Sequence, residues 1–325
     1  RIKAVALSEG ADLVGIAPAE RISGIAPYLQ RIFAAEENYF VVRDKGWEAK
    51  GASVWGGQAM PFNPEAERVK LCARRPEDYL PGARSVVVIG LHLLEASIDH
   101  VGKPPAHKAG HYMAFTHGES INQLSYILLQ IAKWLDDSGY KAHPALDLCN
   151  LASRVCGGAL DLTACRFAAV AAGLGEIGWS GLVLTPEFGP RQRFAALITD
   201  AELEYSPLYA GRSLCTRCFR CVDSCPAQAI SREESFSIEV EGRTFEWGRL
   251  DRLRCDWAKR YGLLGEEGPK YMGSHTDFAI PETITPDAVV EAIHRSDRLQ
   301  RPSGYLSIVE RCFTHCPAAR GPEGS

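Results

Sequence analysis

The sequence lacks several features that would assign it to common classes of protein. It contains no run of 18 or more apolar residues, so we expect no membrane-spanning helix. Its formal net charge is -4, without the strong basic excess that is usual for a nucleic-acid-binding protein. We find no internal repeat and no low-complexity segment. The length of 325 residues is enough for a substantial core, in two domains or in one large domain with an appendage.

Cysteine, by contrast, is abundant. The chain has 11 cysteines, and seven of them lie at or after position 215. This odd, crowded set is a poor disulfide pattern for a secreted protein, and it fits metal ligands in a reduced compartment. We therefore expect a cytoplasmic location, with a cleaved export signal as the alternative because the sequence begins at Arg1 rather than Met. The other four are expected to be small buried side chains: Cys72, Cys149, Cys156 and Cys165.

The spacing of the late cysteines is specific. Residues 215–226 read C-x2-C-x2-C-x3-C-P, the pattern of bacterial ferredoxins. In this pattern three thiolates bind one iron–sulfur cluster and the fourth binds a second cluster. Residues 312–317 supply the other half as C-x3-C-P. The crossover rule predicts that the first cluster is held by Cys215, Cys218, Cys221 and Cys316, and that the second receives Cys225 and Cys312.

The second cluster needs further ligands. Cys255 is the natural third, but the position where the standard pattern has a fourth cysteine is Val309. Either another group such as His315 completes the [4Fe-4S] site, or the cluster is a [3Fe-4S] form. A structural zinc site is the alternative, although zinc sites usually show paired C-x2-C units. Two clusters imply electron transfer, and the remaining two hundred or so residues must then have a task of their own.

The rest of the chain mixes helices and apolar strands, which favours an α+β class with an α/β-type core. Residues 119–138 form the best helix, with one apolar stripe along it. Residues 85–90 read as a strand that is buried on both faces. Glycine and proline make residues 41–84 irregular, and 97–118 reads as a loop. The other expected elements are helices at 2–8, 23–35 and 160–172, the last ending at Gly173, and strands at 12–17 and 193–199.

Several segments outside the cysteine motifs resemble a known superfamily. Residues 11–17 (ADLVGIA) and 80–89 (LPGARSVVVI) are similar to the N-terminal part of cobalamin-dependent reductive dehalogenases and epoxyqueuosine reductases. Residues 167–178 (FAAVAAGLGEIG) and 185–200 (TPEFGPRQRFAALITD) resemble the corrinoid-binding core that these enzymes share. The resemblance covers nearly the entire chain in the right order. The sequence of the two central segments, 167–178 and 185–200, is more similar to the dehalogenase branch.

This resemblance implies a nitroreductase-like corrinoid-binding and substrate core at 1–205, followed by a bacterial-ferredoxin-like two-cluster module at 206–325. It implies cobalamin bound base-off, and the chain lacks the D-x-H-x-x-G motif that supplies a lower histidine ligand elsewhere. Gly173, Gly175 and Gly178 would permit close approach of the cofactor, and a tight helix-to-strand connection is the alternative. Arg191 and Arg193 would bind corrinoid carboxamides or a substrate anion, with a solvated strand edge as the alternative.

The implied activity is reductive cleavage of a carbon–halogen bond, or of a similar leaving group, in a small organic molecule. An external low-potential donor of the ferredoxin or flavodoxin type would supply the electrons. Such a reaction needs a proton donor over the corrin face. The candidates are Tyr112, Asp161 and Arg166, for which the plainer roles are a loop aromatic, a helix cap and a surface charge.

Two other functions compete with this one. An epoxyqueuosine reductase would act on tRNA, and only then would nucleic acid be a partner. Against it, the segment around residue 160 lacks the D-S-A-P-type run that is characteristic of those enzymes. The other alternative is a non-catalytic protein that carries electrons or reactivates the corrinoid of a partner. A tightly bound corrinoid would distinguish an enzyme from such a carrier.

Overall fold

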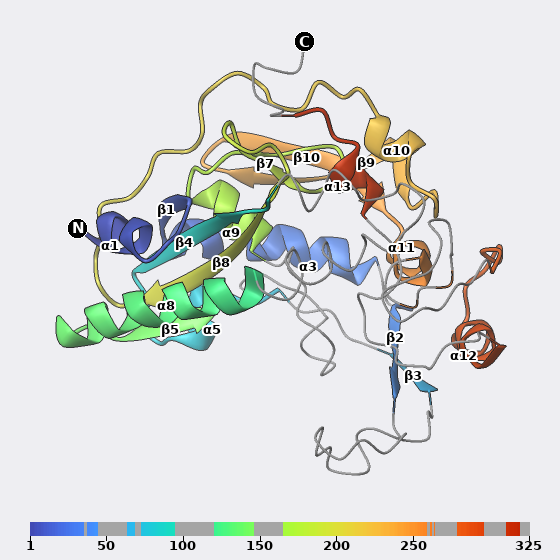
Figure 1. Ribbon diagram of the computed structural model, residues 1–325, viewed down its shortest axis with the longest axis horizontal. Helices are drawn as coiled ribbons and strands as arrows, with labels where there is room; N and C mark the ends of the chain where they lie inside the picture. Colours follow the sequence, from blue (N-terminus) through green and yellow to red (C-terminus); the bar gives the residue numbers. More distant parts are fainter. Residues whose placement is uncertain are drawn as a thin grey trace.

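The computed structural model of the chain is shown in Figure 1. It describes the following residues: 1–35, 38–44, 64–68, 73–94, 120–145, 165–258, 261, 263, 278–295 and 310–318. Tyr112, Asp161, the predicted loop at 97–118 and Val309 lie outside these residues. In the described part of the chain, no helix is both long enough and apolar enough to cross a membrane.

A four-stranded sheet forms the centre of the molecule, and each neighbouring pair of strands is antiparallel. Its spatial order is β1 (Leu13–Pro18), β4 (Ser85–His92), β8 (Gln192–Thr199) and β5 (Ala142–Ala145). The three longer strands confirm those expected from their apolar runs. The short β5 was not expected because it contains Pro144, which a sheet tolerates only where the strand lies at an edge, as here.

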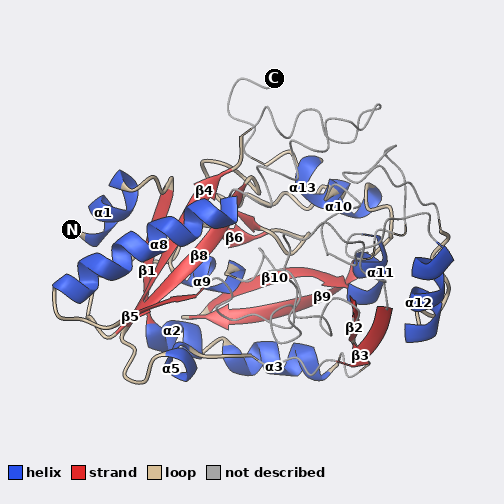
Figure 2. Ribbon diagram, turned by 60° about the horizontal axis from the view of Figure 1, so that its bottom comes forward, coloured by secondary structure: helices blue, strands red, loops and turns tan. Residues whose placement is uncertain are grey.

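Helices α1 (Ile2–Ser8) and α8 (Ser120–Asp137) pack on one face of this sheet (Figure 2). Val87 and Ile89 of β4 join their apolar cluster. Both helices were predicted, and α8 buries the stripe that was expected: Leu124, Ile127, Leu128, Ile131 and Leu135. Because each turn of α8 places apolar side chains toward the sheet, its periodicity alone was enough to identify it.

The opposite face carries α2 (Ala19–Ser23), α3 (Ala26–Ala34) and α9 (Arg166–Ala171). Val86 and Val88 of β4 point into this cluster, so alternate residues of one strand serve the two faces. This confirms that β4 is buried on both sides. The helix predicted for 23–35 is confirmed by α3, which begins a few residues later with a proline in its first turn, whereas the short α2 before it was not expected.

A long hairpin joins the same core as the sheet. It consists of β9 (Ile230–Val240) and β10 (Arg243–Leu250), and its turn residues Glu241 and Gly242 have φ values of 49° and 78°. Such positive values suit the tight two-residue hairpin turn. The hairpin packs into the main apolar cluster through Ile238, Val240, Phe245 and Trp247. Residues on both sides of position 205, where the sequence predicts a boundary between two modules, therefore share one hydrophobic core.

The segment 41–84 was expected to be irregular, but parts of it form regular structure. β2 (Phe40–Asp44) pairs with β3 (Pro64–Arg68), and α5 spans Pro76–Tyr79. The pairing joins strands that are far apart in the sequence, and the β3 sequence PEAER has little β propensity. β2 and the neighbouring helices α11 (Arg252–Ala258) and α12 (Pro286–Arg295) share a second, smaller core.

Candidate cluster sites and the charges that hold them

The first cysteine motif forms a tight loop. Arg217 and Phe219, which flank Cys218, have φ values of 52° and 58°. Left-handed conformations of this kind are costly for residues other than glycine and gather at functional sites. The short helix α10 (Arg220–Asp223) follows and carries Cys221. The loop therefore turns sharply between consecutive cysteines, as a segment that wraps around a compact group must.

Four thiols expected around the first cluster influence one another electrostatically. The pKa of Cys221 is raised to about 12, chiefly by burial and then by the nearby thiols of Cys316 and Cys215. Burial also raises the pKa of Cys316, with smaller upward contributions from Cys215 and Cys218. These effects require the four side chains to lie near one another. The fold thus brings Cys316 from the far C-terminal motif to the three cysteines of the first loop.

A second group gathers Cys225 and Cys255. Both pack against a small apolar cluster made of Ala227, Ala229 and Ala258. The backbone N–H of Ala229 donates a hydrogen bond to the Cys225 sulfur at 3.4 Å. Cys312 lies on α13 (Arg311–Thr314), which packs against α10 (Figure 1). The ring of exposed His315, the guessed fourth ligand, has its Nδ1 3.0 Å from the Thr314 hydroxyl.

Within the described residues, no three side chains of His, Cys, Asp or Glu are grouped as ligands of a single metal ion would be. A cluster makes a different demand, because each cysteine binds a different iron atom and the thiolates stand farther apart. Cys165, by contrast, is fully buried, as predicted for the scattered cysteines. Cys72, Cys149 and Cys156 lie outside the described residues.

A buried carboxylate holds the start of the first cysteine loop. Glu176 belongs to the two-residue strand β6 (Glu176–Ile177), which pairs with β7 (Val183–Leu184), and is 8% exposed. Its Oε1 accepts hydrogen bonds from the backbone N–H groups of Leu214 at 2.6 Å and Cys215 at 2.8 Å. It also accepts one from the Ser213 hydroxyl at 3.0 Å. Sequence reasoning missed this residue, although a single charge between Gly175 and Gly178 was a signal.

Trp179 contacts the same cysteine. Its backbone N–H donates a hydrogen bond to the Cys215 sulfur at 3.3 Å. Its indole N–H donates a hydrogen bond to the Ser231 carbonyl on β9 at 2.9 Å, and the Arg217 guanidinium lies over its ring. The core segment 176–179 therefore supplies both a backbone anchor and a sulfur hydrogen bond to one predicted cluster ligand.

Two buried arginines hold the C-terminal cysteine segment. Arg191 is 1% exposed, and its guanidinium donates to the carbonyls of Cys316 and Ala318, both at 3.3 Å. Arg193, on β8, forms a 2.9 Å ion pair with Glu310 and lies over the Phe313 ring. The alternative of a solvated strand edge is wrong for both residues, because both side chains are buried. Their partners belong to the segment that carries Cys312 and Cys316.

The predicted glycines approach the chain itself. Gly173 has a φ of 78° and follows α9, with the backbone bonds Gly173–Val170 and Leu174–Ala169 closing the helix end. This confirms the expected end of the helix. A Cβ at Gly173 or Gly175 would come within 2.0 Å of a backbone carbonyl, and one at Gly178 would meet the Leu184 side chain at 2.9 Å. The connection between α9 and β7 is tight at all three positions.

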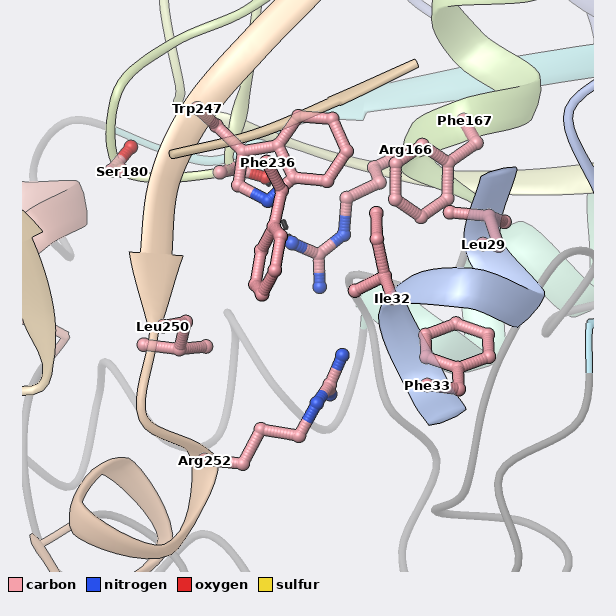
Figure 3. A pocket seen from close by; sticks show the side chains of 11 residues that line it. Leu29, Ile32, Phe33, Arg166, Phe167, Ser180, Phe236, Trp247, Leu250 and Arg252 are labelled. Atoms are coloured by element: carbon pink, nitrogen blue, oxygen red, sulfur yellow. Dashed lines mark hydrogen bonds between the residues drawn. The ribbon is translucent and has the colours of Figure 1, made fainter. Parts of the chain in front are cut away.

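A small pocket that opens to solvent lies between α3, α9 and the hairpin. Figure 3 shows the guanidinium groups of Arg166 and Arg252 directed into this space, with Phe33, Phe236 and Trp247 around it. Arg166 is half-buried and donates a hydrogen bond to the Gly181 carbonyl at 2.9 Å, so it is more than a surface charge. Of the three candidate catalytic residues it alone lies in the described residues.

No protein-family model matches the chain. A tetrachloroethene reductive dehalogenase of Desulfitobacterium hafniense is 30% identical over 268 residues, 77% of this chain and 43% of that protein. An epoxyqueuosine reductase of Synechococcus sp. (strain CC9605) is 31% identical over 244 residues, 74% of this chain and 62% of that protein. The chain spans about half the length of these relatives. A solved reductive dehalogenase aligns with a TM-score of 0.48 at 18% identity, over 79% of this chain and 28% of that chain.

Proposed function

The chain belongs to the superfamily of reductive dehalogenases and epoxyqueuosine reductases, and we propose that it is an oxidoreductase, a reductive-dehalogenase-like enzyme with two iron–sulfur clusters and a cobalamin. The observation that carries this proposal is the convergence of four thiols from two distant segments. The substrate would be a halogenated organic molecule, and an external low-potential protein would supply electrons. We propose a cytoplasmic location for the protein, because thiols that bind metal stay reduced in that compartment.

The first cluster in this proposal is a [4Fe-4S] cluster. Its ligands would be the converging cysteines: Cys215, Cys218, Cys221 and Cys316. The donors fit the group chemically, because thiolates are the ligands of such clusters and a backbone N–H already points at the Cys215 sulfur. Because burial keeps the pKa of Cys221 high, the cluster-free protein would hold a protonated thiol there, and binding of iron would release that proton.

The second cluster would use Cys225, Cys255 and Cys312. The shared apolar packing of the first two supports their assignment to one site. Three cysteines suffice for a [3Fe-4S] cluster, while a [4Fe-4S] cluster would need one more ligand, for which His315 is the candidate. Iron and sulfide per chain distinguish the two forms.

The residues predicted to contact the corrinoid instead contact other parts of the protein. Arg191 and Arg193 bind the C-terminal cysteine segment, and the space beside Gly173 and Gly175 is filled by backbone. None of the described residues is therefore assigned to the corrinoid, and its inclusion rests on homology. When bound, a reduced corrinoid supplies a strong nucleophile and one-electron donor.

We place the substrate side of the reaction at the pocket between α3, α9 and the hairpin. Its aromatic walls suit an apolar organic molecule, and the guanidinium of Arg166 faces its interior. Arg166 stays charged at any working pH, so its proposed role is to orient a substrate or a proton donor rather than to transfer a proton itself. Tyr112 and Asp161 remain proposals for that donor.

The test begins with anaerobic reconstitution of the whole chain, followed by measurement of iron, sulfide and cobalt. We expect close to eight iron atoms per chain for two cubanes, or seven if the second is a [3Fe-4S] form, and one corrinoid visible by absorption. Halide release from halogenated aromatics, driven by a low-potential reductant, then tests the reaction. Zinc in place of iron, or no inorganic sulfide, would overturn the proposal.

The second candidate, epoxyqueuosine reductase, is favoured by the larger share of those relatives that the chain covers. Formation of queuosine in tRNA without halide release would select it. An iron–sulfur spectrum with no corrinoid would select the electron carrier.

A further inference from the structure

We propose that two buried charges, Glu176 and Arg191, set the reduction potential of the first cluster by acting on it with opposite sign. This inference rests on the ligand set of the proposed function. The four ligands come from two segments that are far apart in the sequence, and in each segment a buried charged side chain of the core bonds the backbone of one ligand. Glu176 holds the segment of Cys215, and Arg191 holds the segment of Cys316.

The Glu176 carboxylate bonds directly to the backbone of a proposed cluster ligand, Cys215. Three donors converge on its Oε1, including the N–H of Cys215 at 2.8 Å. Its other oxygen is 3.6 Å from the guanidinium of Arg243, which is only partly buried. Hydrogen bonds of this kind are strengthened by the charge of the acceptor and fix the position of the loop. They leave a negative charge close to the cluster that water screens weakly.

Arg191 occupies the corresponding place on the other segment. It is among the largest fully buried side chains, and it donates to the carbonyls of Cys316 and Ala318 at 3.3 Å. Its bond to the Cys316 carbonyl places this charge next to the backbone of a proposed ligand. Arginine remains charged even when buried, so this positive charge is permanent.

Reduction adds one negative charge to the cluster. A neighbouring cation stabilises that charge and raises the potential, whereas a neighbouring anion lowers it. The N–H of Trp179 acts in the same sense as the cation, because it donates to the Cys215 sulfur. Glu176 therefore makes the cluster a stronger reductant, and Arg191 moderates it. This balance suits an electron carrier that must donate at low potential and still be reducible by its own donor.

The variants separate charge from anchoring. Glu176→Gln keeps an oxygen that accepts from the Cys215 N–H and removes the charge. Arg191→Met removes the charge and keeps an apolar stem, while Arg191→Lys keeps the charge. The matched controls are Glu202→Gln and Arg84→Met, an exposed ion pair of the same two residue types.

The experiment is a redox titration of the anaerobically reconstituted full chain, followed by electron paramagnetic resonance. Iron and sulfide per chain are measured first for every variant. We expect Glu176→Gln to raise the potential of one cluster and Arg191→Met to lower the potential of the same cluster, with the other cluster unchanged. Arg191→Lys and both controls should stay at the wild-type potential.

Shifts of the same sign in Glu176→Gln and Arg191→Met, or no shift in either at full cluster content, would overturn the inference. If Arg191→Met fails to assemble its cluster, Arg191→Gln, which removes the charge and keeps a hydrogen-bond donor, takes its place, and its potential should also lie below that of the wild type. A wild-type chain without iron and sulfide would instead refute the proposed function, so the two failures are distinguishable.

Discussion

The ion pair between Arg193 and Glu310 offers the sharpest test of how the C-terminal cysteine segment is held. Its Nη2–Oε2 distance is 2.9 Å, and the two side chains are 3% and 7% exposed. Removing one partner of such a pair leaves a buried charge without its counterion, at a cost of about 3–5 kcal/mol. We therefore expect Glu310→Leu to lower the free energy of unfolding of the cluster-free protein by that amount.

The double variant Arg193→Met/Glu310→Leu should recover most of this loss, because apolar residues of similar volume fill the site without an isolated charge. Part of the loss remains, since Arg193 also lies 5.1 Å above the Phe313 ring, a contact that contributes up to about 2 kcal/mol when desolvated. With Arg193→Met as the second single variant, at a similar cost of about 3–5 kcal/mol, the cycle should give a coupling free energy of at least about 4 kcal/mol.

Urea unfolding under reducing conditions measures these free energies, and the Arg84–Glu202 pair supplies the control. That pair has the same 2.9 Å separation but both side chains are exposed, so breaking it should cost no more than about 1 kcal/mol. Because Glu310 begins the segment that carries two cluster ligands, Glu310→Leu should also bind less iron on reconstitution. Equal effects of the buried and the exposed pair would refute the reasoning.

Three further predictions concern the cysteines and the glycine connection. Cys218→Ala should lose about one cluster of iron and all turnover, and unchanged iron content would contradict its assignment as a ligand. Gly175→Ala should lower the free energy of unfolding by more than about 3 kcal/mol, because its Cβ would lie 2.0 Å from a carbonyl oxygen; Gly24→Ala, with 3.5 Å of room, should change it little. The pKa of Cys221 rises from 9.0 to about 12 on folding, so the cluster-free protein should be fully stabilised below pH 9 and lose stability as the pH approaches 12. Urea unfolding across this range tests the sign, and Cys221→Ser should flatten the profile.

Elements with a strong local pattern could be predicted from the sequence. The stripe of α8 and the apolar run of β4 identify themselves, because each element buries the faces that its periodicity marks. The pairing of β2 with β3 could not be found in this way, since the β3 sequence PEAER has no alternating pattern of large apolar residues of its own. The hairpin was missed although Glu241-Gly242 between alternating apolar residues is a turn signal.

The same division applies to the candidate site. Cysteine spacing predicts ligands because the loop geometry is local. The charges around the ligands depend on tertiary contacts, so the partnerships of Glu176 with Cys215 and of Arg193 with Glu310 were invisible. For Arg191 and Arg193 we expected polar partners on a cofactor or substrate, and the structure supplies them from the chain's own C-terminal segment.

The hairpin β9–β10 has a consequence for biogenesis. It lies between the two cysteine motifs in the sequence, yet Phe245 and Trp247 fill the core that the central sheet also builds. A nascent chain that has emerged only as far as the first motif lacks both this part of its core and the last thiol of the first cluster. Assembly factors that deliver iron and sulfide would therefore encounter a complete site only after residue 316 has been synthesised and the core has closed. Under the proposed ligand set, metal insertion would thus be a late event in the maturation of this protein.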